Sequence, residues 1–254
     1  MQIANSTILV TGGSSGLGAA CVEMLSRRGA GVIVADVAPP RDQWHADFSE
    51  RVMFSQTDVT SEAAVRAAIV AGENRFGQLR GAVICAGLLH AERVLGREGV
   101  ASFEAFRRVI DVNLNGTFNA VRLAAEAIAR SKPQEDDQRG VIVMTSSVSA
   151  FEGQIGQAAY AASKGGVASL TLPLAREFGQ HAIRVVTIAP GVFDTPMMKA
   201  APDKVRQSLA DQIPFPHRLG QPHEFASLVC HALENNMLNG CILRLDGAIR
   251  MGPK

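Results

Sequence analysis

The chain of 254 residues has few cysteines, no long apolar run and no basic leader. Its four cysteines, Cys21, Cys85, Cys230 and Cys241, fit neither a zinc-binding spacing nor a CxxC redox pair. We therefore expect reduced thiols and no metal site. No apolar run reaches the ~18 residues that a membrane helix needs, and the first residues, MQIANSTILV, lack the basic segment of a targeting peptide. These absences predict a cytoplasmic protein without a membrane partner.

The chain also has almost no net charge and few tyrosines and tryptophans. The chain has 25 Lys and Arg against 24 Asp and Glu, a net charge of +1, with one tyrosine and one tryptophan. This composition provides neither a basic groove nor a stacking platform, so we expect no nucleic-acid partner. Hydrophobic residues make up 47% and charged residues 19%, which predicts a folded chain with a sizeable core.

Short apolar runs alternate with helix-like stretches along the chain. The runs are apolar on successive positions, as in parallel strands covered on both faces, and lie at residues 7–11, 31–35, 52–56, 82–85, 141–145, 184–188 and 241–245. The helix-like stretches lie at residues 19–28, 61–75 (with Thr60 as the cap), 103–130 and 158–179. This order predicts one α/β domain over residues 1–254: a Rossmann fold with a doubly wound, seven-stranded parallel sheet and helices on both faces.

A glycine-rich turn joins the first predicted strand to the first predicted helix. It runs Thr-Gly-Gly-Ser-Ser-Gly-Leu-Gly over residues 11–18. Glycines let the main chain turn tightly beside a pyrophosphate, and the free N–H groups of a helix start bind phosphate. The position of the turn between strand and helix favours a dinucleotide site over a purely structural turn.

Two aspartates follow the next two predicted strands. Asp36 comes 18 residues after Gly18, where a carboxylate can bind both hydroxyls of the adenosine ribose and repel a 2′-phosphate. No Lys or Arg lies in the glycine turn or directly after Asp36, so we predict NAD rather than NADP. A turn-capping role is the alternative for Asp36. Asp58 and Val59 are placed to hold the adenine ring, although Asp58 is equally suited to lead the next helix.

A tyrosine and a lysine are candidates for acid–base chemistry. Tyr160, the only tyrosine, precedes Lys164 by four residues, so the two side chains share one helix face. A nearby ammonium group favours the phenolate form of a phenol whose ordinary pKa is about 10. Tyr160 is therefore a candidate general base.

Two further polar residues accompany this pair. Ser147 follows the strand predicted at 141–145 and is placed to hold a substrate oxygen together with Tyr160, with Ser146 and Ser149 as neighbouring alternatives. Asn113 falls inside a predicted helix, where Asn is a poor helix former. We expect Asn113 either to distort the helix and bind water or to be a buried structural residue.

Taken together, these motifs resemble those of the short-chain dehydrogenase/reductase family over essentially the whole chain. Residues 11–18 match its TGxxxGxG turn, and Asn113, Ser147, Tyr160 and Lys164 match its catalytic tetrad in order and spacing. The resemblance implies a homotetrameric, NAD-dependent enzyme acting on a small-molecule secondary alcohol. Matched residue by residue, the family's cofactor contacts fall on Gly12, Ser15, Gly16, Leu17, Gly18, Asp36, Asp58, Val59, Cys85, Ala86, Gly87, Tyr160, Lys164, Pro190, Gly191, Phe193 and Thr195.

Two positions in this match need comment. Where the family usually has Asn-Ala-Gly after the fourth strand, this chain has Cys85-Ala86-Gly87, which removes the stabilising Asn side chain. No basic partner for Cys85 is identifiable from the sequence, so we expect a small, half-buried residue beside the nicotinamide ribose rather than a nucleophile. For Phe193, core packing is the alternative to cofactor contact.

Longer stretches narrow the resemblance to one branch of the family. Residues 150–160, 214–220 and 244–251 are similar to the type 2 3-hydroxyacyl-CoA dehydrogenases, and Cys85-Ala86-Gly87 also suits that branch. Most of these residues have no catalytic duty, so the similarity indicates a specific relative. It implies oxidation of 3-hydroxyacyl-CoA to 3-oxoacyl-CoA, a step of fatty acid metabolism.

The resemblance also implies a role for each tetrad residue. Tyr160 takes the proton from the secondary alcohol, and Ser147 orients the oxygen, so these two bind the substrate. Lys164 binds the nicotinamide ribose and lowers the pKa of Tyr160, and Asn113 places a water that links Lys164 to solvent. Pro190 and Gly191, followed by Thr195, match the family's segment beside the nicotinamide. The residues from 195 to about 220 come next and are expected to form a substrate lid.

Two other functions remain open at this point. One is the same chemistry on a hydroxysteroid or another bulky secondary alcohol, since pocket shape decides between these substrates. The other is a non-enzymatic scaffold that binds NAD and a protein partner. The complete tetrad argues against the scaffold, because a scaffold does not need all four residues.

Overall fold

The computed structural model of the chain describes residues 1–40, 49–97, 99–199 and 202–253. Seven parallel strands form one sheet in the order β3-β2-β1-β4-β7-β8-β9. They are β1 (Thr7–Thr11), β2 (Gly31–Asp36), β3 (Val52–Gln56), β4 (Leu79–Ile84), β7 (Gly140–Thr145), β8 (Ile183–Pro190) and β9 (Cys241–Leu245). The predicted Rossmann fold is confirmed. Strand order reverses between β1 and β4, the point where such sheets bind ligands.

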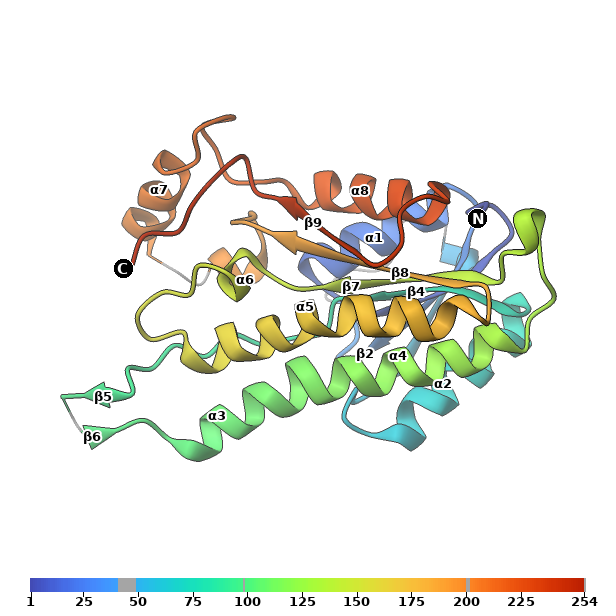
Figure 1. Ribbon diagram of the computed structural model, residues 1–254, viewed down its shortest axis with the longest axis horizontal. Coiled ribbons are helices and arrows are strands. Elements are labelled where there is room, and N and C mark those ends of the chain that lie inside the picture. The colour runs from blue at the N-terminus through green and yellow to red at the C-terminus, as the bar shows by residue number, and fades with distance from the viewer. Residues whose placement is uncertain (41–48, 98, 200–201, 254) are drawn as a thin grey trace.

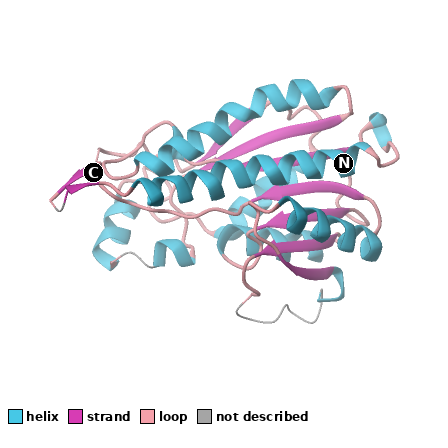
Figure 2. Cartoon of the chain, turned by 90° about the horizontal axis from the view of Figure 1, so that it is seen from below, coloured by secondary structure: helices cyan, strands magenta, loops and turns pink. Residues whose placement is uncertain are grey.

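Helices cover both faces of this sheet (Figures 1 and 2). One layer contains α1 (Gly16–Arg27) and α8 (Pro222–Glu234), whose buried residues join one core cluster. The other contains α2 (Glu62–Phe76), α4 (Gly116–Ala129) and α5 (Ala158–Gly179), whose buried residues join a second cluster. The sheet is the middle of three layers.

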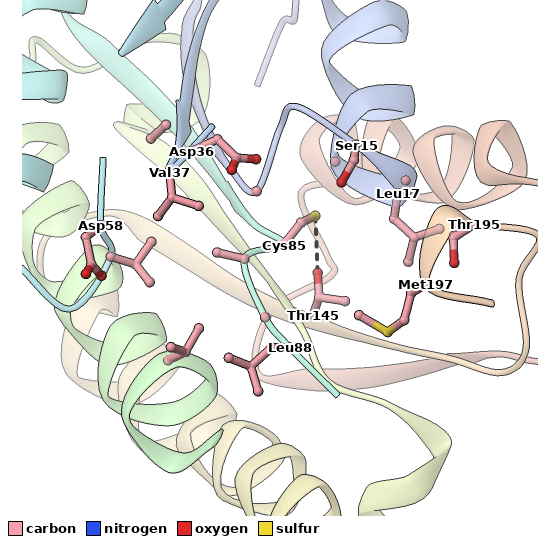
Figure 3. Close-up of a pocket in the computed structure, with 18 of the residues that line it drawn as sticks. Ser15, Leu17, Asp36, Val37, Asp58, Cys85, Leu88, Thr145, Thr195 and Met197 are labelled. Carbon is pink, nitrogen blue, oxygen red and sulfur yellow. Dashed lines mark hydrogen bonds between the residues drawn. The ribbon is translucent and has the colours of Figure 1, made fainter. Parts of the chain in front are cut away.

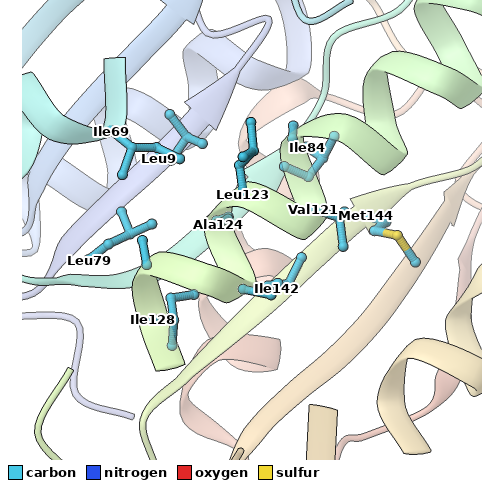
Figure 4. Close-up of a cluster of buried hydrophobic side chains, with 14 of the residues drawn as sticks. Leu9, Ile69, Leu79, Ile84, Val121, Leu123, Ala124, Ile128, Ile142 and Met144 are labelled. Carbon is cyan, nitrogen blue, oxygen red and sulfur yellow. The ribbon is translucent and has the colours of Figure 1, made fainter. Parts of the chain in front are cut away.

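Successive strand residues serve the two layers in turn. In β1, Ile8 and Val10 pack with the α1–α8 layer, whereas Leu9 packs with the opposite layer (Figure 4). In β7, Val143 and Met144 divide in the same way. Because both faces of the sheet are buried, the side chains on each face are mainly apolar. This burial explains the runs of successive apolar residues in the sequence.

The structure corrects several predicted boundaries. The strand predicted at 82–85 spans Leu79–Ile84, and the helix predicted at 19–28 already begins at Gly16. Ser61, not Thr60, caps α2: its hydroxyl accepts a hydrogen bond from the Ala64 amide at 3.3 Å. Thr60 instead donates its hydroxyl proton to Asp58. Serine and threonine are both common N-cap residues, so the sequence alone did not decide which of the two adjacent residues caps α2.

The helix predicted over residues 103–130 contains a change of winding. It consists of α3 (Phe103–Ile110), a π-helical turn (Asp111–Asn115) and α4. Asn113 lies in the π turn, so the helix is distorted at this residue. Such single-turn π bulges often occur at functional sites.

Several small elements project beyond the carboxyl edge of the sheet. They are the hairpin of β5 (Leu95–Gly96) and β6 (Gly99–Val100), with α6 (Pro196–Lys199) and α7 (Asp203–Asp211) within the predicted lid segment. Residues 200 and 201 of that segment lie outside the described residues. The sequence pattern did not predict these short elements. Closure of the segment over a substrate stays a prediction.

Two further findings concern the chain as a whole. None of the described helices is long and apolar enough to cross a membrane. All four cysteines are free thiols, with Cys21 and Cys230 buried and the other two partly buried.

Replacing Leu9 by Ala tests the two-layer core. Leu9 is fully buried, so we expect Leu9→Ala to lower the free energy of unfolding by about 2–5 kcal/mol. Urea denaturation measures this change. In the matched control Leu95→Ala, at a side chain that is 79% exposed, the change should stay within about 0.5 kcal/mol. Equal losses in both variants would contradict the assignment of Leu9 to the core.

Candidate active site

Glycines shape the turn between β1 and α1. Gly12 has a positive φ of 65°, and a Cβ there would lie 2.7 Å from the Ala86 amide nitrogen. A Cβ on Gly18 would lie 2.2 Å from the Gly12 carbonyl oxygen. Only glycine fits these two close approaches. The turn thereby brings the start of α1 against the end of β4.

A cavity of about 560 Å³ lies at the carboxyl edge of the sheet (Figure 3). It is bordered by residues at or just after the ends of β1, β2, β4, β7 and β8. Most of the predicted cofactor residues line it: Gly12, Ser15, Gly16, Leu17, Gly18, Asp36, Asp58, Val59, Cys85, Ala86, Gly87, Tyr160, Lys164, Pro190 and Thr195. One continuous hollow thus contains the glycine turn at one side and the tyrosine–lysine pair at another.

Asp36 both caps a turn and faces the cavity, so the two roles predicted for it are compatible. Its carboxylate accepts hydrogen bonds from the Ser14 amide at 3.0 Å and from the Ala38 amide at 3.4 Å, and Asp36 also lines the cavity. The first bond ties the end of β2 to the glycine turn. A negative charge is therefore held at this end of the cavity, and its contact with a ribose stays a prediction.

Asp58 has a local structural role. Its Oδ1 accepts hydrogen bonds from the Thr60 amide at 2.9 Å and the Thr60 hydroxyl at 2.8 Å, which forms the turn that leads into α2. The alternative of a helix-leading aspartate is confirmed. Asp58 and Val59 nevertheless line the cavity, so the adenine contact stays a prediction.

Tyr160 and Lys164 lie one turn apart in α5. The ammonium nitrogen of Lys164 is 5.8 Å from the centre of the Tyr160 ring and donates a hydrogen bond to the Thr145 carbonyl at 2.8 Å. Burial lowers the pKa of Lys164 to about 8, partly opposed by Cys85. In the chain alone the pKa of Tyr160 is raised, because burial outweighs its hydrogen bond with Ser147. The predicted lowering by Lys164 is therefore not seen in the chain alone.

Ser147 joins Tyr160, whereas its neighbours have other partners. The hydrogen bond between Ser147 and Tyr160 places the predicted serine beside the phenol. Ser146 instead donates its hydroxyl to the Lys164 carbonyl at 2.8 Å, and the Ser149 amide donates to the Ser147 hydroxyl at 3.1 Å. Of the three serines, Ser147 is the one next to the Tyr160 phenol, whereas Ser146 is the one that lines the cavity. The holding of a substrate oxygen by Ser147 stays a prediction.

Asn113 is fully buried and its side-chain amide is occupied by protein partners. Its Oδ1 accepts from the Leu88 amide at 2.8 Å, and its Nδ2 donates to the Leu88 carbonyl at 2.9 Å and to the Ser163 hydroxyl at 3.1 Å. Ser163 in turn donates to the Tyr160 carbonyl. The structural alternative is thus confirmed, and Asn113 links the end of β4 to the helix of Tyr160. Its placing of a water stays a prediction.

Cys85 is half-buried and lines the cavity, as predicted, with its sulfur 3.4 Å from the Thr145 hydroxyl (Figure 3). A hydrogen bond with Cys21, followed by smaller contributions from Thr145 and Lys164, lowers the pKa of the Cys85 thiol against the effect of burial. The charge of Lys164 thus acts on Cys85, an effect that the sequence did not identify because the two residues lie far apart in the chain.

The residues after β8 divide between cavity and core. Pro190 and Thr195 line the cavity, whereas the Gly191 amide donates to the Leu245 carbonyl at 2.9 Å. The Phe193 ring packs edge-on against Phe225, with ring centres 6.4 Å apart. Core packing therefore accounts for the Phe193 side chain, and its cofactor contact stays a prediction.

Some cavity and support residues were missed from the sequence. Thr145 and Leu88 provide main-chain partners for Lys164 and Asn113, and Arg108 lines the cavity. Main-chain partners leave no residue-type signal. The sequence places Thr145 at a strand end but gives no sign that its carbonyl binds Lys164.

Comparison with known proteins agrees with this geometry. A family model of the short chain dehydrogenases matches residues 6–206. The chain belongs to the short chain dehydrogenase family. It is therefore an oxidoreductase, and dehydrogenases of this family use nicotinamide cofactors.

Close relatives within the short chain dehydrogenases share one name. The chain is 50% identical to the 3-hydroxyacyl-CoA dehydrogenase type-2 of Drosophila melanogaster, covering 99% of this chain and 100% of the relative. It is 47% identical to the human protein of that name, covering 96% and 95% of the two chains. The crystal structure of 3-hydroxyacyl-CoA dehydrogenase type-2 from Mycobacterium avium matches with a TM-score of 0.92 and 45% identity, covering 98% and 97%.

The lowered pKa of Lys164 predicts how this dehydrogenase's stability depends on pH. Below pH 8 the native state holds a buried charge, and between about 8 and 10.5 the unfolded state binds more protons, so this contribution to stability rises with pH. We expect Lys164→Met to be more stable than wild type at pH 7, by at most about 3 kcal/mol. Urea titrations should show this advantage shrinking from pH 8 to pH 10. A difference independent of pH would contradict the burial of a charged Lys164.

Proposed function

We propose that the chain oxidises the 3-hydroxyl group of 3-hydroxyacyl-CoA thioesters to a ketone, with NAD as the cofactor. The observation that carries the substrate class is the identity of about half of all residues, over nearly the whole chain, with relatives named for this reaction. The placement of Tyr160 and Lys164 in the cavity lining, with Ser147 next to Tyr160, supports the reaction type.

The cavity fits a dinucleotide. The glycine turn admits a phosphate close to the main chain at Gly12, and the start of α1 at Ser15 to Leu17 presents free N–H groups to the same space. Asp36 provides a carboxylate for a ribose at one end, and Lys164 provides an ammonium donor at the other. NAD bound here would supply the hydride acceptor for the reaction.

The protein's own residues handle the proton. Ser147 holds the substrate hydroxyl beside the Tyr160 phenol, and Tyr160 takes the proton as the general base. Burial raises the pKa of Tyr160 in the chain alone, and we expect the charge of Lys164, together with that of bound oxidised NAD, to favour the phenolate. Lys164 also binds the cofactor ribose. Asn113 maintains the geometry by tying Leu88 and Ser163 together.

The acyl end of the substrate would meet the segment after Thr195. Met197 lines the cavity, and Met198 packs against the cluster of Val192, Ile213 and Ile249 beneath the segment. Flexible methionine side chains suit an apolar chain of variable length. We propose that residues 195–220 close over the bound thioester as a lid.

The setting of the enzyme is part of the same proposal. We infer a homotetramer in the cytoplasm that serves fatty acid metabolism. The resemblance to the family supports the tetramer, and partly exposed apolar side chains at Phe118 of α4, Leu172 of α5 and Ile242 of β9 would suit contacts between subunits.

The first test is the turnover of 3-hydroxybutyryl-CoA with NAD, measured through the formation of NADH. We expect turnover by the wild type and a fall of at least about 100-fold in kcat for Tyr160→Phe, because the general base is lost. NADH binding, measured by fluorescence, should be unchanged in the variant. Wild-type turnover of a hydroxysteroid alone would contradict the acyl-CoA substrate. Full activity of Tyr160→Phe would contradict the base.

The second test concerns NAD against NADP. Asp36→Asn removes the charge that repels a 2′-phosphate while keeping the shape of the side chain. We expect the ratio of kcat/KM for NAD over NADP to fall by at least about tenfold, since like charges in contact cost more than ~1.4 kcal/mol. A wild-type preference for NADP, or an unchanged ratio in the variant, would contradict the role of Asp36.

A further inference from the structure

The helix that carries Tyr160 begins without a local cap. Tyr160 is the third residue of α5, which starts at Ala158. The N-cap residue is Gln157, and within the described chain its side chain makes no capping hydrogen bond to the first turn. An uncapped first turn leaves amide groups without partners and frays more readily. Contacts made outside the helix therefore gain importance for the position of Tyr160.

The C-terminal tail, residues 246–253, provides these contacts. Gln157 Nε2 donates to Gln154 Oε1 at 3.3 Å, and Gln154 Nε2 donates to the Gly252 carbonyl at 3.1 Å. The Ile155 amide donates to the Pro253 carbonyl at 3.0 Å. In Figure 1 the tail ends beside the loop that leads into α5. A chain of hydrogen bonds thus runs from the start of Tyr160's helix to the tail.

Glu152 is the ionic centre of this junction. Its carboxylate accepts from Arg244 Nη1 at 2.8 Å and from the Met251 amide at 3.0 Å, and lies 3.4 Å from Arg250 Nε. The Glu152 side chain is only 19% exposed, so solvent screens these interactions weakly. Burial raises the pKa of Glu152, but the Arg244, Met251 and Arg250 contacts outweigh it and keep the carboxylate charged. Glu152 lies in the loop between Ser147 and Tyr160.

The tail is itself anchored on its other side. Arg244, near the end of β9, binds Asp246 at 2.8 Å and the Ile249 carbonyl at 3.2 Å. Ile249 is fully buried in the cluster with Val192 and Ile213, and Met251 packs against that cluster. The tail is therefore fixed to the core at Ile249 and to the loop through Glu152.

Lys164 has separate anchors. Its ammonium group and its main-chain carbonyl are held by Thr145 and Ser146, at the end of β7. Loosening of the loop should therefore displace Tyr160 while leaving Lys164, and with it the cofactor site, in place. This difference separates a role in positioning Tyr160 from a general structural role.

We propose that Glu152 and the C-terminal tail act as positioning elements for Tyr160, replacing the missing cap of α5 with a tie between the loop 151–157 and the tail. The effect on turnover rests on the proposed function. The effect on Tyr160 itself does not.

The test uses Glu152→Gln, which removes the charge, and Glu152→Ala, which removes every contact of the carboxylate. The control Glu234→Gln breaks a 2.7 Å ion pair with Arg28 far from the tail. We expect kcat with NAD and 3-hydroxybutyryl-CoA to fall about 10- to 100-fold in Glu152→Ala, since small misplacements of a reacting group cost that much. The fall should be smaller in Glu152→Gln, with NADH affinity unchanged in both. The control should match wild type.

A second readout needs no substrate. Tyr160 is the only tyrosine, so ultraviolet titration of the phenolate reports this residue alone. Since burial is the main cause of its raised pKa, we expect the pKa in Glu152→Ala to move toward the ordinary value of about 10. Hydrogen exchange at Ile155 and Met251 should rise in the same variant, which shows that the tie is broken.

The outcomes separate the two proposals. If the wild type does not oxidise 3-hydroxybutyryl-CoA, the proposed function fails, and the titration still tests the tie. If exchange at Ile155 and Met251 rises while the Tyr160 titration and kcat match wild type, the positioning role is overturned. Unchanged exchange in Glu152→Ala would also overturn it, because Glu152 would then not hold the tail.

Discussion

The burial of both faces of the central sheet is the constraint on which the rest of the structure depends. Leu9 on one face and Val10 on the other are both fully buried, so neither face offers room for a polar site. Only the ends of the strands remain available. Parallel strands all end at the same edge, and the cavity lies there, bordered by Asp36, Cys85 and Pro190.

The same constraint explains why the site contains buried polar groups with fixed partners. Lys164 and Asn113 lie under the helices at this edge, where an unpaired charge or amide would be costly. Each is therefore held by main-chain groups at strand ends: Lys164 by the Thr145 carbonyl, and Asn113 by both polar groups of Leu88. These bonds orient the proposed catalytic residues in the absence of any ligand. The tie between Glu152 and the tail adds support just before the start of Tyr160's helix.

Sequence patterns predicted the sheet well because a strand that is buried on both faces has apolar residues at successive positions. The runs at 7–11, 52–56 and 241–245 match β1, β3 and β9 at both ends. Helix boundaries were less predictable where neighbouring residues had similar propensities, as with Thr60 and Ser61 before α2. The hairpin of β5 and β6 escaped prediction because its strands are two residues long and exposed. So short an element leaves no periodic pattern.

The sequence by itself determined the fold class, the family and the identity of the residues around the cavity, because these follow from local spacing and residue type. The tertiary structure alone decided which groups are paired. It set Lys164 beside Cys85, occupied the Asn113 amide with Leu88 and Ser163, and directed the Phe193 ring into the core. It also joined the tail to the loop before Tyr160. These contacts link residues far apart in the chain, often through main-chain atoms that every residue has. They therefore cannot be predicted from the types of the residues involved.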